Sequence, residues 1–330
     1  MTDNIDLAIT AKSLKSDESE PTYSGVQSFL RRKYSKNLEG VDVAVLGIPL
    51  DLATSNRPGA RFGPSAVRSA SAVMAWERPY GWDFDPRKVL SIIDYGDLHF
   101  DFARPDKIAS DIERQLAAIL KTNTATLALG GDHYISYPIL KAMYAKHGPL
   151  ALIHFDAHPD TWEDEEDRLY SHGTMFWHAA REGIIVPEKS VQIGIRTYNQ
   201  ESLGFNIFDA PWVHGHDIQT LCDEVSRKVG EQPAYLTFDI DCLDPAFAPG
   251  TGTPVSGGLS SAQALGILRG LRGIDFVGGD VVEVAPAYDV GQVTALAAAH
   301  VAYEFLALYA ARPGGPCHQT SNNKNEDHAK

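Results

Sequence analysis

The chain has 330 residues, of which 44% are hydrophobic and 22% charged, and its formal net charge is −14 at pH 7. This composition is typical of a globular protein, and the acidic balance argues against a nucleic-acid partner, because binding phosphate groups requires a basic surface. No apolar run approaches the roughly 20 residues that span a bilayer, so we expect no membrane segment. The three cysteines are far apart and show no pairing pattern, which favours a reducing compartment such as the cytoplasm.

The two ends of the chain differ from the middle. Residues 1–20 and 313–330 are polar and carry few large apolar side chains. They cannot bury enough surface to offset the entropy lost on ordering, so we expect two flexible tails. Residues 21–312 contain no linker-like stretch and no internal repeat, which favours a single domain.

Short apolar segments alternate with helical patterns along this domain. Several apolar segments are continuous, as expected for parallel strands that are covered on both faces. Two intervening segments, residues 110–120 and 260–271, place apolar side chains on one helical face. Strands separated by helices predict an α/β fold with a parallel sheet. The eight expected strands are residues 41–48, 89–93, 124–129, 150–155, 190–195, 205–208, 234–238 and 276–284.

Carboxylates and imidazoles follow three of these strands, at the end of a parallel sheet where ligands bind. Extended backbone sends alternate side chains to one face, so the members of each motif can converge if the strand persists. Four carboxylates in one crevice repel one another, and two divalent cations would balance their charge. Such a donor set suits Mn²⁺ or a similarly hard ion. The candidate ligands are His133 after the third strand, Asp156, His158 and Asp160 after the fourth, and Asp239 and Asp241 after the seventh.

Each motif also has an ordinary structural explanation. A lone Asp-x-Asp commonly caps a helix or a loop, and a lone histidine at a strand end is more often a satisfied polar group than a ligand. The combination of three such motifs at neighbouring strand ends favours metal binding. His154 precedes the expected strand end, and we assign it to a buried position that supports the ligands.

The motifs GGDH, DAHPD and TFDIDCLDPAFAPGTGTP resemble those of the ureohydrolases, the family of arginases and agmatinases. The similarity extends from about Phe29 to Ala311. The resemblance implies a three-layer α/β/α domain with an eight-stranded parallel sheet, often assembled as a hexamer or a trimer. Further stretches are similar to bacterial agmatinases, namely residues 53–55, 75–77, 172–176, 191–197 and 281–289.

The resemblance also implies how two manganese ions are held, although nickel replaces manganese in some relatives. A hydroxide that bridges the two ions would attack the guanidinium carbon. One ion would be bound by His133, Asp156, Asp160 and Asp239, and the other by His158, Asp156, Asp239 and Asp241, with Asp156 and Asp239 bridging.

Two further residues match catalytic positions of the family. His172, in the HGTMF motif, matches the proton shuttle, and its unperturbed pKa of roughly 6.5 suits that task. Glu283, in VVEVAP, matches the carboxylate that receives the guanidinium group. The ordinary alternatives are a turn cap for His172 and a surface ion pair for Glu283.

The segment after DAHPD bears on the choice of substrate. Residues 163–167 are five consecutive acids, which would suit the distal ammonium group of agmatine and disfavour a carboxylate tail. A solvated acidic loop that touches no substrate is the equally open alternative. Agmatinases typically have a shorter loop here and a threonine in place of Pro159. The candidate substrate-binding residues are Trp162, Glu163, Asp164 and Thr253.

The favoured function is hydrolysis of agmatine, a small cationic guanidino compound, to putrescine and urea. A second hypothesis keeps the chemistry and changes the substrate to guanidinobutyrate, guanidine or a biguanide-like compound. A third is a catalytically silent subunit on the same fold. The retention of all six candidate ligands argues against the third.

Overall fold

The computed structural model describes residues 5–18, 20–164 and 171–318. Residues 165–170 of the expected acidic loop lie outside the described residues. The same holds for residues 1–4, 19 and 319–330 of the two expected tails.

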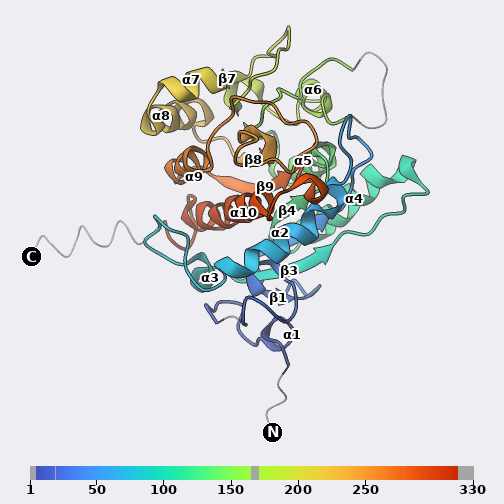
Figure 1. The fold of residues 1–330 in the computed structure, drawn as a ribbon, viewed down its shortest axis with the longest axis vertical. Coiled ribbons are helices and arrows are strands. Elements are labelled where there is room, and N and C mark those ends of the chain that lie inside the picture. The colour runs from blue at the N-terminus through green and yellow to red at the C-terminus, as the bar shows by residue number, and fades with distance from the viewer. Residues whose placement is uncertain (1–4, 19, 165–170, 319–330) are drawn as a thin grey trace, which may run out of the picture.

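A single parallel sheet forms the centre of the molecule (Figure 1). Its strands in the described part of the chain are β1 (Lys33–Tyr34), β2 (Val43–Ile48), β3 (Ile92–Asp97), β4 (Ala125–Gly130), β5 (Ala151–Phe155), β6 (Val191–Ile193), β7 (Asn206–Phe208), β8 (Ala234–Asp239) and β9 (Phe276–Val282). Their order is β1-β3-β2-β4-β9-β8-β5-β6-β7, and every pairing between them is parallel. The strand missing from the eight predicted is β1, whose two residues at the sheet edge are too few to form a recognisable apolar pattern.

Helices cover both faces of the sheet, which confirms the predicted three-layer α/β/α fold (Figure 1). Helices α4, α5 and α6 pack together over one face, and α2, α8, α9 and α10 cover the other. The helices are α1 (Leu7–Thr10), α2 (Gly63–Ser71), α3 (Pro86–Val89), α4 (Pro105–Leu120), α5 (Ser136–His147), α6 (Met175–Arg181), α7 (Ala210–Gly215), α8 (Ile218–Val229), α9 (Ser261–Gly270) and α10 (Val293–Ala311).

Local sequence signals explain where the two predicted helices begin. In α9, the Ser260 side chain accepts a hydrogen bond from the Gln263 N–H, and the Gln263 side chain accepts one from the Ser260 N–H. This reciprocal cap satisfies two backbone donors, and the helix begins within one residue of its predicted start. Helix α4 begins at Pro105, five residues before its predicted start, because proline is well suited to the first turn of a helix.

Helix α10 corrects the expectation that no segment approaches the length and apolarity of a membrane span. Its 19 residues are apolar enough to cross a bilayer, but 78% of its most apolar stretch is buried inside the molecule. It packs against β9, α2 and α9. Its Glu304 accepts hydrogen bonds from Trp82 Nε1 (2.5 Å) and Arg269 Nη2 (2.6 Å). These contacts are those of a core helix.

The described part of the N-terminal segment contacts the domain. The Asp6 side chain caps α1, and Lys33 Nζ donates to the carbonyl of Ala11 (2.8 Å). Arg32 Nη2 donates to the carbonyl of Glu18 (2.9 Å). Side chains in β1 and directly before it therefore hold backbone carbonyls within residues 11–18. The flexibility of the tail stays a prediction.

Candidate metal centre

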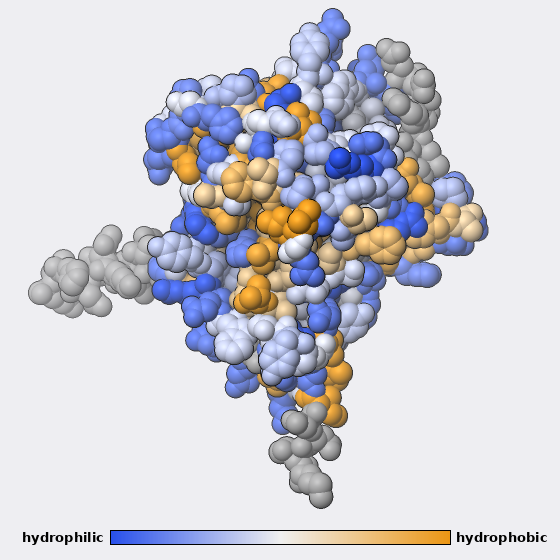
Figure 2. Space-filling view, viewed as in Figure 1, coloured by the Kyte–Doolittle hydropathy of each residue, from blue (hydrophilic) through white to orange (hydrophobic). Residues whose placement is uncertain are grey.

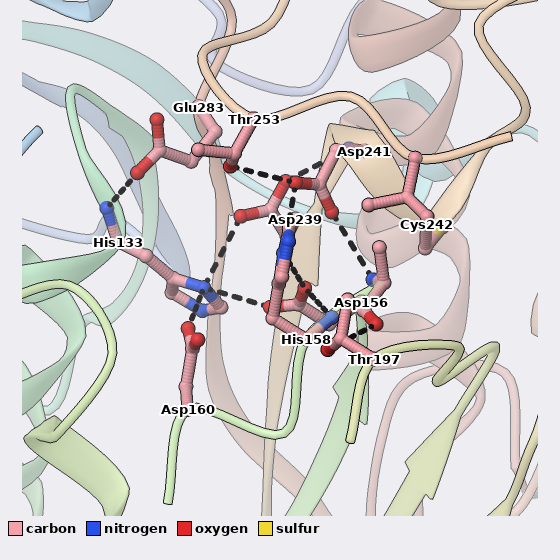
Figure 3. A network of polar contacts seen from close by, with 12 residues as sticks. His133, Asp156, His158, Asp160, Thr197, Asp239, Asp241, Cys242, Thr253 and Glu283 are labelled. Atoms are coloured by element: carbon pink, nitrogen blue, oxygen red, sulfur yellow. Dashed lines mark hydrogen bonds and ion pairs between the residues drawn. The ribbon is translucent and has the colours of Figure 1, made fainter. Parts of the chain in front are cut away.

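The four central strands β4, β9, β8 and β5 are neighbours, so their carboxyl ends share one edge. The candidate metal ligands lie at or after the ends of β4, β5 and β8, and Glu283 follows β9. Figure 3 shows these side chains pointing toward one another, with Thr253 and Glu283 beside them. We call six residues the ligand cluster: His133, Asp156, His158, Asp160, Asp239 and Asp241.

His133 forms the more deeply buried half of the ligand cluster. It begins the 3-10 turn His133–Ile135 after β4, and its side chain is fully buried. Within the described part of the chain, its Nδ1 has no hydrogen-bond partner. A buried ring nitrogen that faces carboxylates without bonding to them fits a lone pair directed at a cation. The oxygens nearest to Nδ1 belong to Asp160 (2.9 Å), Asp156 (3.0 Å) and Asp239 (3.3 Å).

His158 forms the more open half, with 17% of its side chain exposed. Its Nδ1 lies 3.3 Å from Asp156 Oδ1 and 3.1 Å from Asp241 Oδ2. Asp156 therefore presents one oxygen to each imidazole, an arrangement that suits a bridging carboxylate. Asp239 places Oδ2 near His133, while its Oδ1 accepts the N–H of Asp241 (2.8 Å).

The residues of DAHPD converge for a reason other than the predicted one. Strand β5 ends at Phe155, so no extended backbone carries Asp156, His158 and Asp160 to one face. The Asp160 backbone instead adopts a left-handed conformation (φ 50°), which is unfavourable for most residues but tolerated by aspartate. This turn returns the Asp160 carboxylate to His133. Similarly, Asp241 lies in the 3-10 turn Ile240–Cys242 after β8 rather than in the strand.

The charge of the cluster fits a pair of divalent cations. Burial, together with the charges of Asp241 and Asp156, raises the pKa of Asp239 well above its usual range. Burial opposes protonation of His133, but contact with three carboxylates raises the pKa of this histidine well above its ordinary value. Both directions reflect excess negative charge, which bound cations would neutralise. The donors are carboxylate oxygens and ring nitrogens, a set that suits Mn²⁺ and related ions.

His154 supports the cluster from behind, as the sequence predicts. Gln192 Nε2 donates to the carbonyl of Pro159 (2.6 Å), which fixes the orientation of the amide, since a carbonyl can only accept. The same nitrogen lies 3.1 Å from His154 Nδ1, so this ring nitrogen accepts. His154 Nε2–H then donates to Asp156 Oδ2 (2.7 Å). Its two nitrogens are both engaged, and His154 orients a carboxylate rather than binding an ion.

His172 and Glu283 lie together, as expected of a shared catalytic site. His172 Nδ1 is 3.0 Å from Glu283 Oε1, and His172 Nε2 is 2.7 Å from Ser55 Oγ. Burial lowers the pKa of His172, but the hydrogen bond and charge of Glu283 raise it to about 9. Glu283 Oε1 also accepts the N–H of His133 (2.9 Å), and the Glu283 backbone is left-handed (φ 63°). Strain of this kind persists where surrounding contacts hold a functional side chain in place.

The four candidate substrate-binding residues lie in different surroundings. Trp162 lies beside the cluster, with its ring 6.4 Å from that of His158 and its Nε1 donating to the carbonyl of Tyr198 (3.3 Å). Thr253 Oγ1 donates to Asp241 Oδ2 (3.2 Å). Glu163 is exposed. The Asp164 carboxylate is buried and lies 3.1 Å from His178 Nε2 on α6.

Sequence reasoning missed two residues at the site. Ser55 reaches His172 from a loop that is 117 residues away in the sequence. Asp132 is buried beside the cluster and accepts the N–H of Ala53 (2.8 Å). Burial and the charge of Glu283 raise the pKa of Asp132 to about 8. Asp132 was visible as the third letter of GGDH, and Ser55 lies in an agmatinase-like stretch, but no local pattern assigns Ser55 a role because its partner comes from a distant segment.

Comparisons with known proteins agree with this geometry. The family model described as "Arginase family" matches residues 41–308. An agmatinase of Chromobacterium violaceum is 53% identical over 92% of this chain and 94% of its own length. The crystal structure of a hypothetical agmatinase from Burkholderia thailandensis is 56% identical, with a TM-score of 0.91 over 92% of this chain and 97% of that one. The proclavaminate amidino hydrolase of Streptomyces clavuligerus is 38% identical, with a TM-score of 0.82 over 88% of this chain and 99% of that one.

The chain belongs to the arginase family. The family assignment and the fold predicted from the motifs are thereby confirmed, and all six residues of the ligand cluster lie within the stretch that the family model matches. The agmatinase of C. violaceum matches nearly end to end, so the resemblance extends well beyond the metal-binding motifs.

Proposed function

We propose that this arginase-family chain hydrolyses agmatine to putrescine and urea. The observation that carries the proposal is the placement of Glu283 beside the ligand cluster. Its Oε1 contacts His172 and the backbone of His133, whereas its buried Oε2 has no hydrogen-bond partner among the described residues. A free carboxylate oxygen at this position is a suitable acceptor for guanidinium N–H groups. The resemblance to proteins named agmatinase supports the choice of substrate.

The ligand cluster would hold two cations, which we propose to be Mn²⁺ or alternatively Ni²⁺. When bound, such a pair lowers the pKa of a water molecule so that it can act as a nucleophile near neutral pH. Asp156 would bridge, because it presents one oxygen to His133 and the other to His158. We assign the second bridge to Asp239 from the family resemblance.

Glu283 and His172 divide the remaining tasks. Glu283 would orient the guanidinium group and keep its carbon facing the cluster. His172 is held between Glu283 and Ser55, and its contact with the Glu283 carboxylate favours the protonated form of the ring. We assign it the transfer of that proton to the leaving nitrogen, which departs as a neutral amine.

A urea-release assay over guanidino compounds with cationic, neutral and anionic tails tests the substrate assignment. The protein is loaded with Mn²⁺ and, separately, with Ni²⁺. We expect agmatine to give the highest kcat/KM. The anionic-tailed compounds are included because a structural neighbour at 38% identity is named an amidino hydrolase of proclavaminate. Urea release from a neutral- or anionic-tailed compound, and none from agmatine, would overturn the assignment.

We also propose that the chain acts as a homo-oligomer, a hexamer or a trimer, in the cytoplasm. Exposed apolar side chains support assembly, and Figure 2 shows such side chains gathered on the face where α2 and α10 lie. Val73 follows α2, Val290 precedes α10 and Val293 begins it, and the side chains of all three are exposed. The three cysteines are free and buried, which suits a reducing compartment. Analytical ultracentrifugation of the metal-loaded protein tests the assembly, and a mass of one chain at micromolar concentration would contradict it.

A further inference from the structure

A buried aspartate in the middle of the sheet has no place in the mechanism above. Asp280 lies within β9, where it interrupts an apolar run, and it is 1% exposed. Three hydroxyl groups donate to its carboxylate. They belong to Thr237 (2.7 Å, to Oδ1), Ser136 (2.8 Å, to Oδ2) and Tyr235 (2.8 Å, to Oδ2).

Strand register connects this aspartate to the ligand cluster. Thr237 on β8 pairs directly with Asp280 on β9. The Thr237 hydroxyl also lies 2.8 Å from Nε2 of His133. A chain of two hydrogen bonds therefore runs from the Asp280 carboxylate through Thr237 to the far nitrogen of a candidate ligand.

The direction of this chain follows from the number of protons. A threonine hydroxyl has one proton, and here it is donated to the Asp280 carboxylate, which accepts. Thr237 can then only accept from His133, so Nε2 carries the ring proton. In a neutral imidazole the other nitrogen, Nδ1, is left with a lone pair.

An independent observation points the same way. His133 Nδ1 faces three carboxylate oxygens but has no hydrogen-bond partner among the described residues. Carboxylate oxygens that converge on one ring nitrogen form the donor set of a cation site, to which the nitrogen contributes its lone pair. A lone pair on Nδ1 is what a cation requires.

We propose that Asp280, acting through Thr237, is a positioning residue that holds His133 in the Nε2–H tautomer and directs its Nδ1 lone pair toward the metal centre. The inference rests on the proposed two-metal centre. It assigns to a buried strand residue the orientation of a ligand that it does not touch.

Three variants separate the hydrogen-bond chain from the packing around it. Thr237→Val keeps the shape and removes the hydroxyl, whereas Thr237→Ser restores a hydroxyl. Tyr235→Phe removes a different donor to Asp280 and leaves the chain intact. For each variant, the two Mn²⁺ dissociation constants are measured by competition with a chelator, and folding is checked by thermal unfolding.

We expect Thr237→Val to raise one of the two Mn²⁺ dissociation constants by about 10–100-fold, which means weaker binding at that site. Thr237→Ser and Tyr235→Phe should keep both constants close to those of the wild type. Two unchanged constants in a folded Thr237→Val variant would overturn the proposal. Wild-type protein that binds no Mn²⁺ would instead overturn the metal centre itself, so the two failures are distinguishable.

Ring ¹⁵N chemical shifts of the wild-type, metal-free protein give a second test, in which the hydrogen-bond chain itself is unchanged. The His133 signals are assigned by their loss in His133→Asn. We expect a protonated Nε2 and an unprotonated Nδ1 at a pH that is high enough for the ring to be neutral. A proton on Nδ1 instead would contradict the proposal.

Discussion

The ligand cluster and the segment 161–164 are adjacent in the chain but are held in different ways. The cluster is built from the ends of β4, β5 and β8, and its side chains range from fully buried to 17% exposed. The segment 161–164 is anchored mainly to a loop, through Trp162 to the carbonyl of Tyr198 and through Asn199 to Thr161. The edge of a sheet thus holds the ligand cluster, and a loop anchors the segment beside it, where we predict that substrate tails are distinguished.

A substitution at the shared carboxylate should have the largest effect. Asp156→Asn removes a charge that faces both imidazoles. We expect the variant to lose both Mn²⁺ ions. Its kcat/KM for urea release should fall by more than the roughly 10–100-fold that follows removal of a residue that only hydrogen-bonds to a metal ligand. Mass-spectrometric metal content and kcat/KM measure the effect. Asp217→Asn, at the exposed N-terminal cap of α8, is the control and should bind two ions.

Glu283→Gln should reduce the rate of agmatine hydrolysis without loss of Mn²⁺ from the ligand cluster. The change removes the charge that faces the guanidinium group while keeping the size of the side chain. We expect kcat/KM for agmatine to fall by on the order of 10²–10³, with two Mn²⁺ ions per chain retained. Glu224→Gln, a surface residue paired with Arg227, is the matched control. A Glu283→Gln variant with wild-type kcat/KM would show that the Glu283 charge does not orient the guanidinium group.

The pairing of His172 with Glu283 predicts a pH dependence of stability in the metal-free protein. The pKa of His172 is about 9 in the folded chain and roughly 6.5 unfolded. Because the folded value is higher, the stabilisation is full below pH 6.5 and is lost as the pH rises through 9. We expect the free energy of unfolding to fall by on the order of 1–3 kcal/mol between pH 6.5 and 9.5.

Urea unfolding at the two pH values measures this difference. Asp132, with a pKa raised to about 8, contributes in the same direction, so some loss should remain in any variant. His172→Gln should show a smaller fall than the wild type. His216→Gln, at an exposed position, should behave like the wild type. If the free energy of unfolding fell equally in His172→Gln and in the wild type, His172 would not be the cause of the pH dependence.

The smallest effect separates two neighbouring acids of the segment 161–164. Glu163 is exposed, so Glu163→Gln should raise the KM for agmatine by about 2–5-fold if the carboxylate attracts the distal ammonium. Asp164 is buried against His178, so Asp164→Asn should reduce the free energy of unfolding by about 1–3 kcal/mol and leave the KM unchanged. Steady-state kinetics and urea unfolding of both variants measure the contrast. The reverse pattern would show that Asp164 is the residue that faces substrate.

The sequence was informative wherever a side chain follows a buried strand directly. Continuous apolar segments located the strands, and the acids and histidines after them named the ligand cluster. The pattern was less informative where the strand stops early. Asp160 and Asp241 reach the cluster from turns, and the conformation of a turn depends on contacts made elsewhere in the fold.

The amino-acid sequence by itself determined the α/β fold and the residue types of the ligand cluster, because strand periodicity and donor chemistry are local properties. Its motifs carried the resemblance to the family. Only the tertiary structure decided which atoms meet. Glu283 reaches His133 across 150 positions, and Asp280 reaches Thr237 through the register of β8 and β9. These contacts depend on how strands distant in the chain align, and strand alignment is set by the packing of the whole sheet.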